Sequence, residues 1–318
     1  MKKSLIVLAI IIVAVVLGIF WWQRGLLPVD SANKTPKIFV INNGEGVREI
    51  ANNLKKEGLI RDPVVFFLLA RQRGLDKQIQ AGDFRLNPSQ SAIDIATTLT
   101  HGTLDIWTTV PEGLRAEEIA NILKEKIPGY NASWNLELDK NEGYLFPDTY
   151  LIPRDADINL IISLMRNNFD SKYQGVLGTK TTNLTDAETL VVASIVEREA
   201  VFEQDRPLVA SVIMNRLGLG MALGIDPTVQ YAVGYDPVTK SWWKKELTVD
   251  DLAINSPYNT RKNAGLPPTP ISNPGISAIK AALAPANTDY LYFFSDKKGH
   301  LHFATTIQGH QANIKKYQ

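Results

Sequence analysis

A short pattern occurs three times in the N-terminal part of the chain, and it constrains the fold more than any other feature of the sequence. Each copy has four residues typical of a strand end and a turn, followed by an amphipathic segment with apolar residues at helical spacing. The copies begin at Ile41, Leu86 and Val110, and their helical segments follow at residues 49–55, 94–99 and 118–124. We therefore predict a repeated unit of strand, turn and helix.

The segments between the copies complete a small module. Residues 63–73 are rich in Phe and Leu and predict a second helix, and residues 81–86 predict a second strand. The order strand, helix, helix, strand over residues 38–107 resembles a LysM-like module, which in its family contacts N-acetylated glycans. A packing or spacer subdomain without sugar contact is an equal alternative, because no exposed aromatic row stands out. Residues 108–150 hold the remaining copy and predict a connecting subdomain.

The chain begins with a long apolar run. Residues 5–22 carry no charge, and about 18 residues at ~1.5 Å each nearly match a hydrocarbon layer of ~30 Å. The run is longer than the apolar part of a signal peptide and no small-residue cleavage site follows, so we predict an uncleaved transmembrane helix. Lys2 and Lys3 place residues 1–4 in the cytoplasm and the chain after Gln23 outside. Residues 23–37 predict a tether.

The composition excludes several classes of protein. A chain of 318 residues exceeds what one hydrophobic core usually organises, so we expect more than one globular unit. Hydrophobic residues at 45% and charged residues at 21% exclude intrinsic disorder and a polytopic membrane protein. The net charge of +1 argues against a nucleic-acid partner. The absence of cysteine excludes thiol catalysis, disulfides and cysteine-bound metal.

The strongest chemical signal lies at the end of a predicted buried helix. Thr185 and Glu188 form a capping box, and residues 190–196 are apolar on every face. The helix ends in Glu197-Arg-Glu199, where burial and the negative end of the helix dipole raise a carboxyl pKa, as a general acid requires. The two glutamates lie about 200° apart around the helix, so only one can face a cleft, and periodicity does not decide which. A solvated helix terminus is the alternative interpretation.

Further elements are predicted around this helix end. Asp205 is expected to cap a helix over residues 207–217, Asp226 to cap the next helix, and Asn273 to cap a helix over residues 274–283. The loops over residues 256–260 and 265–271 are rich in Pro and Asn and suit the walls of a groove. Residues 290–295 and 300–304 predict a β-hairpin.

Several of these segments resemble a known family in their order and spacing. They are residues 193–199, 210–216, 226–229, 258–260, 265–268, 273–275 and 290–293. They resemble the MltG or YceG-like family of membrane-bound endolytic lytic transglycosylases of peptidoglycan. The resemblance implies an α+β fold, with an N-terminal transmembrane helix, the LysM-like βααβ subdomain and a lysozyme-like α+β catalytic domain over residues 151–318.

The same resemblance implies the site and its chemistry. Glu199 is expected as the catalytic acid, and the residues expected around the glycan are Glu197, Asn215, Asp226, Gln230, Tyr258 and Asn259. The implied reaction protonates the oxygen between N-acetylmuramic acid and N-acetylglucosamine, and the muramic C6 hydroxyl then attacks to leave a 1,6-anhydro end. It requires no cofactor and no metal. Arg261 and Thr269 depart from the family pattern and affect expectations about the subsites.

Two other functions remain open at this level, a lysozyme-like hydrolase and a non-catalytic, membrane-tethered glycan-binding scaffold. The expected partners are peptidoglycan strands and, by resemblance, peptidoglycan synthases of the elongation or division machinery. The expected location is the bacterial cytoplasmic membrane, with the catalytic domain outside the cytoplasm. The spacing of His300 and His302 fits hairpin packing better than a metal site. Trp242 and Trp243 are expected to be buried anchors rather than a sugar platform.

Overall fold

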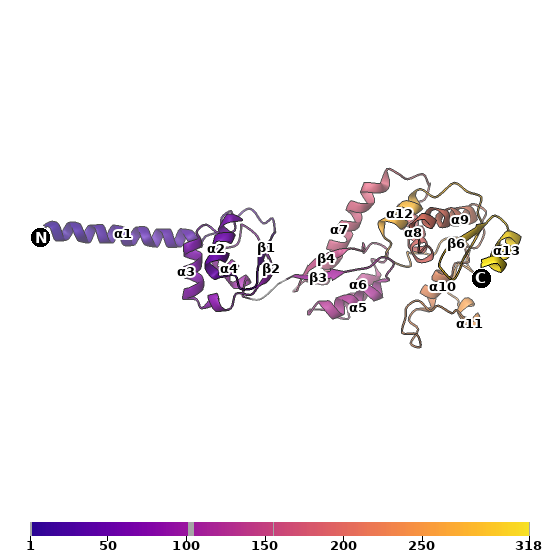
Figure 1. Ribbon diagram of the computed structural model, residues 1–318, viewed down its shortest axis with the longest axis horizontal. Helices are drawn as coiled ribbons and strands as arrows, with labels where there is room; N and C mark the ends of the chain where they lie inside the picture. The colour runs from indigo at the N-terminus through magenta and orange to yellow at the C-terminus, as the bar shows by residue number, and fades with distance from the viewer. Residues whose placement is uncertain (1, 101–104, 155, 318) are drawn as a thin grey trace. The chain divides into compact units, whose positions relative to one another are not determined.

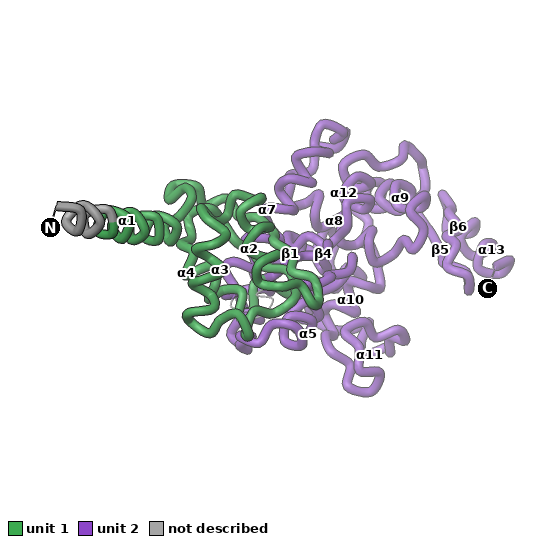
Figure 2. Tube along the Cα trace, turned by 60° about the vertical axis from the view of Figure 1, so that its left-hand side comes forward, with its two compact units in different colours: residues 1–106, 153–155 green, residues 107–152, 156–318 purple. Residues whose placement is uncertain are grey.

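A computed structural model describes residues 2–100, 105–154 and 156–317, with side chains from residue 11 on. The chain forms two compact units of α+β structure (Figure 2). Unit 1 comprises Met1–Ile106 with Pro153–Asp155, and unit 2 comprises Trp107–Ile152 with Ala156–Gln318. Residues 101–104, which belong to the predicted LysM-like stretch, lie outside the described residues.

Unit 1 contains a pair of strands and the helices that cover them (Figure 1). Its elements are α1 (Lys2–Leu26), β1 (Lys37–Ile41), α2 (Val47–Lys56), α3 (Pro63–Gln72), the 3-10 helix η1 (Leu75–Lys77), β2 (Gly82–Leu86) and α4 (Ala92–Thr98). Strands β1 and β2 are antiparallel, with Lys37 opposite Leu86 and Ile41 opposite Gly82. The elements β1, α2, α3 and β2 thus follow the order strand, helix, helix, strand.

The predicted repeat of strand, turn and helix is confirmed in all three copies. Strand β1 leads to α2, β2 leads to α4, and β3 (Asp105–Thr109) leads to α5 (Ala116–Lys126). The reason is that each helix buries the same apolar positions, which gives each copy one face to pack. These buried residues are Ile50, Ala51 and Leu54 in α2, Ile95, Ala96 and Leu99 at α4, and Ile119, Ala120 and Leu123 in α5.

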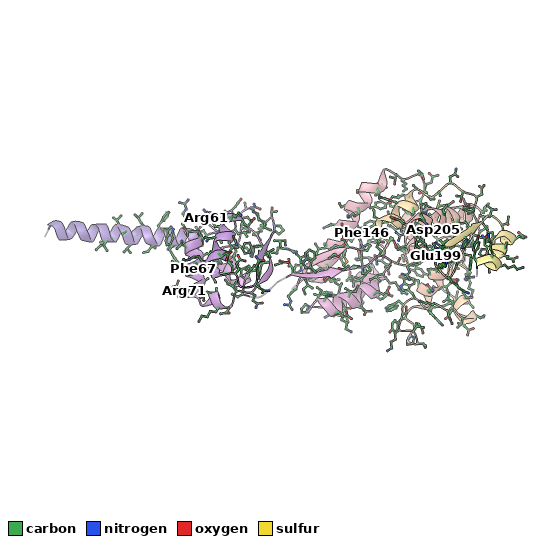
Figure 3. All side chains as sticks on the ribbon, viewed as in Figure 1. Arg61, Phe67, Arg71, Phe146, Glu199 and Asp205 are labelled. Atoms are coloured by element: carbon green, nitrogen blue, oxygen red, sulfur yellow. The ribbon has the colours of Figure 1, made fainter. Side chains whose placement is uncertain are left out.

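The C-terminal part of α1 packs on unit 1. Trp22 and Leu26 lie against the core of this unit, and the Nε1 of Trp21 donates a hydrogen bond to Asp62 at 3.0 Å. Arg61 (Figure 3) donates to the carbonyl oxygens of Pro28 and Val29 at 2.7 and 3.0 Å. The segment predicted as a tether after residue 22 is therefore held against the unit in its first half.

The predicted transmembrane helix is not supported. Across the part of the chain that the structure describes, no helix is both long enough and apolar enough to cross a membrane. The expected span over residues 5–22 is corrected accordingly.

Unit 2 holds the strand pair β3 and β4 (Thr149–Pro153), a group of helices and a C-terminal hairpin. The helices after α5 are α6 (Trp134–Asp139), α7 (Ile158–Leu177), α8 (Asp186–Glu199), η2 (Glu203–Asp205), α9 (Arg206–Gly218), α10 (Asp226–Val233), α11 (Val249–Leu252), α12 (Ile276–Leu283) and α13 (Ile307–Tyr317). The predicted hairpin is confirmed as β5 (Tyr292–Ser295) and β6 (Leu301–Ala304), paired antiparallel.

Helix α8 is the centre of the core of unit 2. Its residues from Thr189 to Val196 are all buried, as its continuous apolar run predicts, and helices α9 and α12 pack on it. The capping box is confirmed, because the Thr185 hydroxyl accepts from the Glu188 amide and the Glu188 carboxylate accepts from the Thr185 amide. A buried helix fixed at its start holds its last turn, which carries Glu199, in a defined place.

Two predicted helix caps are wrong. Helix α12 has Gly275 as its N-cap and α10 has Ile225, so neither Asn273 nor Asp226 fills the cap position. Asn273 is fully buried, and its Oδ1 accepts from the amides of Gly143 and Leu145, both at 2.9 Å. The short amide side chain of Asn can hydrogen-bond nearby backbone groups both at a helix cap and in a buried loop. The residue type alone therefore does not distinguish the two roles.

Candidate active site

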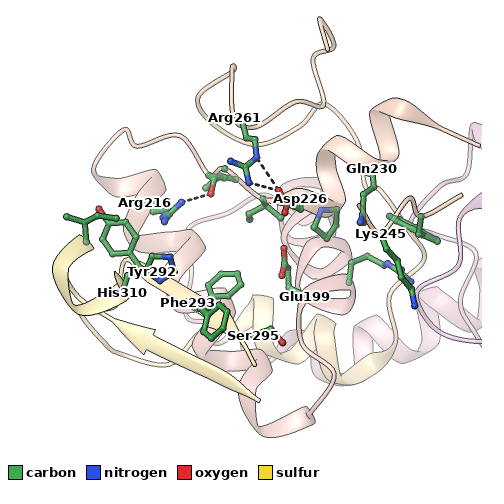
Figure 4. Close-up of a pocket in the computed structure, with 18 of the residues that line it drawn as sticks. Glu199, Arg216, Asp226, Gln230, Lys245, Arg261, Tyr292, Phe293, Ser295 and His310 are labelled. Atoms are coloured by element: carbon green, nitrogen blue, oxygen red, sulfur yellow. Dashed lines mark hydrogen bonds and ion pairs between the residues drawn. The ribbon is translucent and has the colours of Figure 1, made fainter. Parts of the chain in front are cut away.

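A cleft of about 900 Å³ lies at the C-terminal end of α8 in unit 2 (Figure 4). Its walls come from the last turn of α8, the start of α10, the loop before α11, the loop that carries Arg261, and strand β5. The side chains that give it chemical character are Arg198, Glu199, Arg216, Asp226, Gln230, Trp243, Lys245, Arg261, Tyr292 and His310.

Glu199 is the last residue of α8 and its carboxyl group points into the cleft (Figure 4). Burial and, to a smaller extent, the charge of Asp226 raise the pKa of Glu199, Arg198 and Arg261 oppose the shift, and the net pKa is about 7. Within the described residues, its carboxyl makes no hydrogen bond or ion pair. The raised pKa favours the protonated form near neutral pH, and the proton has no protein partner among the described residues.

Asp226 lies beside Glu199 in the cleft wall and is already paired. Its Oδ1 accepts from the Nε of Arg261 at 3.1 Å and from an Nη of the same guanidinium at 2.5 Å. Figure 4 shows the two carboxyl groups of Glu199 and Asp226 on the same wall, with Arg261 above them. The negative charge of Asp226 disfavours ionisation of Glu199.

Glu197 lies outside the cleft lining and is used within the fold. Its Oε1 accepts from Arg206 at 2.8 Å, and its Oε2 accepts from the amide of Gly275 at the start of α12 at 2.9 Å. The carboxyl is buried, which raises its pKa, while the Gly275 amide and Arg206 oppose that shift. The structure thus answers the question that helical periodicity left open: Glu199 faces the cleft and Glu197 faces α12.

Arg198, between the two glutamates, anchors the helix end in another direction. Its guanidinium lies 3.8 Å from the ring centroid of Trp243 and donates to the carbonyl of Gly113 at 3.2 Å. Trp243 in turn donates from Nε1 to Glu118 of α5 at 2.9 Å. Because Glu197 is turned towards α12 and Arg198 is held against Trp243, Glu199 is the carboxyl group that the last turn of α8 presents to the cleft.

The other residues expected around the glycan are divided between the cleft and the loops behind it. Gln230 lines the cleft, and its amide donates to the Lys244 carbonyl at 2.9 Å. Asn215 donates to the carbonyls of Thr288 and Tyr290, outside the cleft lining. The rings of Tyr258 and Tyr231 lie 4.8 Å apart and are tilted by 48°, and the Tyr258 hydroxyl lies 2.5 Å from that of Thr269.

Asn259 is fully buried behind the Arg261 loop. Its amide donates to the carbonyls of Leu252 and Ile254, and its Oδ1 accepts from the amide of Arg261 at 3.0 Å. It fixes the backbone from which Arg261 reaches Asp226. Asn259 therefore supports the site through Arg261 rather than by lining the cleft.

Sequence reasoning missed several residues of the cleft. Arg216 donates to the carbonyls of Leu291 and Leu223 at 2.6 and 2.5 Å, and its guanidinium lies 5.1 Å from the Tyr292 ring. Tyr292 stacks on His310 at 5.6 Å, and burial lowers the pKa of that histidine. Arg216 is part of the motif over residues 210–216, which was a usable signal. His310 and Lys245 carried none, because only the tertiary fold brings them to the cleft.

The described residues offer no metal centre in this cleft or elsewhere. Across the residues that the structure describes, no group of three or more His, Asp or Glu side chains could hold a metal ion. His300 stacks on Phe202 and His302 on Tyr317, at 4.7 and 3.7 Å between ring centroids. Trp243 is largely buried yet also contributes to the cleft wall.

Comparisons with known proteins agree with this architecture. The chain is 34% identical to the endolytic murein transglycosylase of Bacillus subtilis, over 94% of this chain and 90% of that protein. It is 29% identical to the endolytic murein transglycosylase of Streptococcus pneumoniae serotype 2, over 94% of this chain and 62% of that protein. A crystal structure of a yceG-like protein from Listeria monocytogenes matches with a TM-score of 0.56 and 30% identity, covering 88% of this chain and 99% of that one. Residues 39–316 match the YceG-like family, and the chain belongs to this family.

Proposed function

We propose that this chain is an endolytic murein transglycosylase that cleaves peptidoglycan strands internally and without water. The observation that carries the proposal is Glu199, a carboxyl group with a pKa of about 7, aimed into a cleft without a protein partner. The relatives named as endolytic murein transglycosylases support the substrate class, because they align over almost the whole chain.

Glu199 acts as the general acid and then as the base. In its protonated form it donates its proton to the oxygen that links N-acetylmuramic acid to N-acetylglucosamine, while positive charge develops at the anomeric carbon. The resulting carboxylate accepts the proton of the muramic C6 hydroxyl, whose oxygen forms the 1,6-anhydro bond. Because this hydroxyl is tethered to the reacting ring, proximity favours it over water. A pKa near the working pH suits both proton transfers.

Asp226 serves this chemistry as a charged neighbour rather than as a nucleophile. Two-carboxylate glycosidases use a second carboxylate as a nucleophile or as a base for water. Here the guanidinium of Arg261 holds Oδ1 of Asp226 through two hydrogen bonds, which restrains its approach to a sugar carbon. This arrangement supports a mechanism with one proton-transferring carboxyl group.

The proposed substrate also indicates where in the cell the reaction takes place. Peptidoglycan lies outside the cytoplasmic membrane of bacteria, so we place the catalytic unit there, acting on newly made strands and ending their elongation. Enzymes that synthesise those strands are the proposed partners.

Product analysis tests the proposed function. Purified protein is incubated with purified peptidoglycan, and the released strands are examined by mass spectrometry. The account predicts internal fragments that end in 1,6-anhydro-N-acetylmuramic acid, which is one water lighter than a reducing end. Reducing ends would assign the chain to the lysozyme-like hydrolases, and uncleaved strands would assign it to the glycan-binding scaffolds.

A further inference from the structure

A second hollow lies beside the cleft on the segment between α10 and α11. It has a volume of about 760 Å³ and is bordered by Val238, Thr239, Trp243 and Glu246. Val238 is 88% exposed, an unusual position for an apolar side chain with no described function. The mechanism proposed above uses none of these groups except the ring of Trp243, which supports Arg198.

The hollow adjoins the cleft. Ser241, Trp243 and Lys245 line both spaces, so a molecule in the cleft can extend a branch over these three residues. In the view of Figure 4, Lys245 lies on the side of Glu199 away from Tyr292 and His310. The hollow is therefore reached from one end of the cleft.

Lys245 is the cation at this junction that has no partner in the described structure. Arg198 stacks on Trp243, Arg261 is paired with Asp226, and Lys244 is paired with Asp251 at 2.6 Å. Among the described residues, no hydrogen bond or ion pair involves the Lys245 side chain, which is exposed. An ammonium group beside an apolar wall can bind a carboxylate without first breaking an internal ion pair.

We propose that this hollow binds the stem peptide that branches from the muramic acid of the substrate, with Lys245 bound to one of its carboxylates. The inference rests on the proposed function and names the part of the substrate that is bound outside the cleft. The chemistry of the peptide matches the hollow: its alanine methyl groups suit the wall formed by Val238 and Trp243. Its free amino group on the diamino residue suits the exposed carboxylate of Glu246.

The experiment compares two substrates and three forms of the protein. One substrate is uncrosslinked strands that carry stem peptides, and the other is the same strands after an amidase has removed the peptides. The unaltered chain, Lys245→Gln and the control Lys126→Gln are assayed for kcat and KM on both. Lys126 is exposed at the end of α5 and lies outside both spaces. Lys126→Gln therefore removes the same positive charge as Lys245→Gln without altering the cleft or the hollow.

The unaltered chain is expected to prefer the peptide-bearing strands. Lys245→Gln is expected to lower kcat/KM on these strands roughly 10-fold, through KM, because the carboxylate loses its charged partner, and this change corresponds to about 1.4 kcal/mol. In Lys245→Gln, the ratio of kcat/KM on peptide-bearing strands to kcat/KM on peptide-free strands therefore falls. Lys126→Gln is expected to keep the ratio of the unaltered chain. An equal loss on both substrates, or no loss on either, overturns the inference. Cleavage by the unaltered chain in that case leaves the proposed function intact, whereas a chain that cleaves neither substrate refutes the proposed function itself.

Discussion

The acidity of Glu199 is set by a few named neighbours. Burial and the charge of Asp226 raise its pKa, the cations of Arg198 and Arg261 limit the shift, and the net pKa is about 7. The two cations are fixed by other contacts, Arg198 by Trp243 and Arg261 by Asp226. The protonation state of Glu199 thus depends on the contacts that hold these charged neighbours in place.

Replacement of Asp226 by Asn tests this arrangement. The substitution removes a negative charge beside Glu199 and leaves Arg261 without its partner. Both changes favour the ionised form of Glu199, so its pKa falls, and the loss of activity on the alkaline side moves to lower pH by about one pH unit. The measurement is the pH profile of kcat/KM for strand cleavage.

The position of the alkaline limb decides this prediction, whatever the absolute rate of the variant. Asp250→Asn, an exposed carboxylate on α11, is the matched control and should leave the profile in place. If the alkaline side of the pH profile stays in place or moves to higher pH in Asp226→Asn, the charge of Asp226 does not raise the pKa of Glu199.

At the scale of elements, the end of α8 is fixed by contacts to three other segments. Glu197 joins it to α9 and α12, and Arg198 joins it to the loop after β3. A second brace, Asn273, connects the loop before α12 with the loop around Gly143 and with the buried Glu142, to which it donates at 2.7 Å. The cleft therefore depends on loops that are held by side-chain hydrogen bonds.

Removal of the Asn273 brace should cost stability. Asn273→Ala leaves the amides of Gly143 and Leu145 without their acceptor in a buried region, and each such loss costs about 1–3 kcal/mol. We expect the free energy of unfolding to fall by roughly 2–4 kcal/mol, measured by urea unfolding. Asn287→Ala, at an exposed position, should change it little. An equal effect of both substitutions would contradict the role of the brace.

The elements that the sequence predicted well are those whose determinants are local. The repeated helices bury residues at a fixed spacing, and the capping box of α8 lies within four consecutive residues, 185–188. Asn273 was misassigned because its partners lie about 130 residues away in the chain, at Gly143 and Leu145. A contact of that range leaves no periodic or neighbouring signal in one sequence.

For the whole molecule, the same contrast between local patterns and long-range contacts decides which residues of the site could be predicted from the sequence. Burial and the end of a helix marked Glu197 and Glu199 as candidates, but the choice between them depended on Arg206 and Gly275, which no local pattern identifies. Lys245 and His310 reach the cleft only through the tertiary fold. The predicted membrane span rested on the apolar run, its flanking residues and the family resemblance, and no helix of the described residues supports it.

The stability of the chain should depend on pH through Glu142. Burial raises the pKa of Glu142 to about 8 from an ordinary value of 4.5. The neutral form is favoured in the fold, so its contribution is complete below about pH 4.5 and is lost as pH rises through about 8. This loss amounts to roughly 3–5 kcal/mol, from about 1.4 kcal/mol for each unit of pKa shift.

Comparison with Glu142→Gln isolates that contribution. The difference in free energy of unfolding between the unaltered chain and the variant, followed by urea unfolding from pH 5 to pH 8, should shrink as pH rises and then reverse sign. Glutamine cannot ionise, so the variant retains only the pH dependence of other groups. A difference that stays constant with pH would mean that Glu142 is ionised in the folded chain.

The most direct test of the central claim is the turnover of Glu199→Gln on purified peptidoglycan, with anhydro-ended fragments counted by mass spectrometry. Glutamine keeps the shape of the side chain but cannot donate the proton, so the rate should fall by at least 10²-fold to 10⁴-fold, the usual contribution of general acid–base transfer. Glu125→Gln, at an exposed position on α5, should cleave at the unaltered rate, and the thermal unfolding of both variants should match that of the unaltered chain. Retained cleavage by a folded Glu199→Gln would contradict the account.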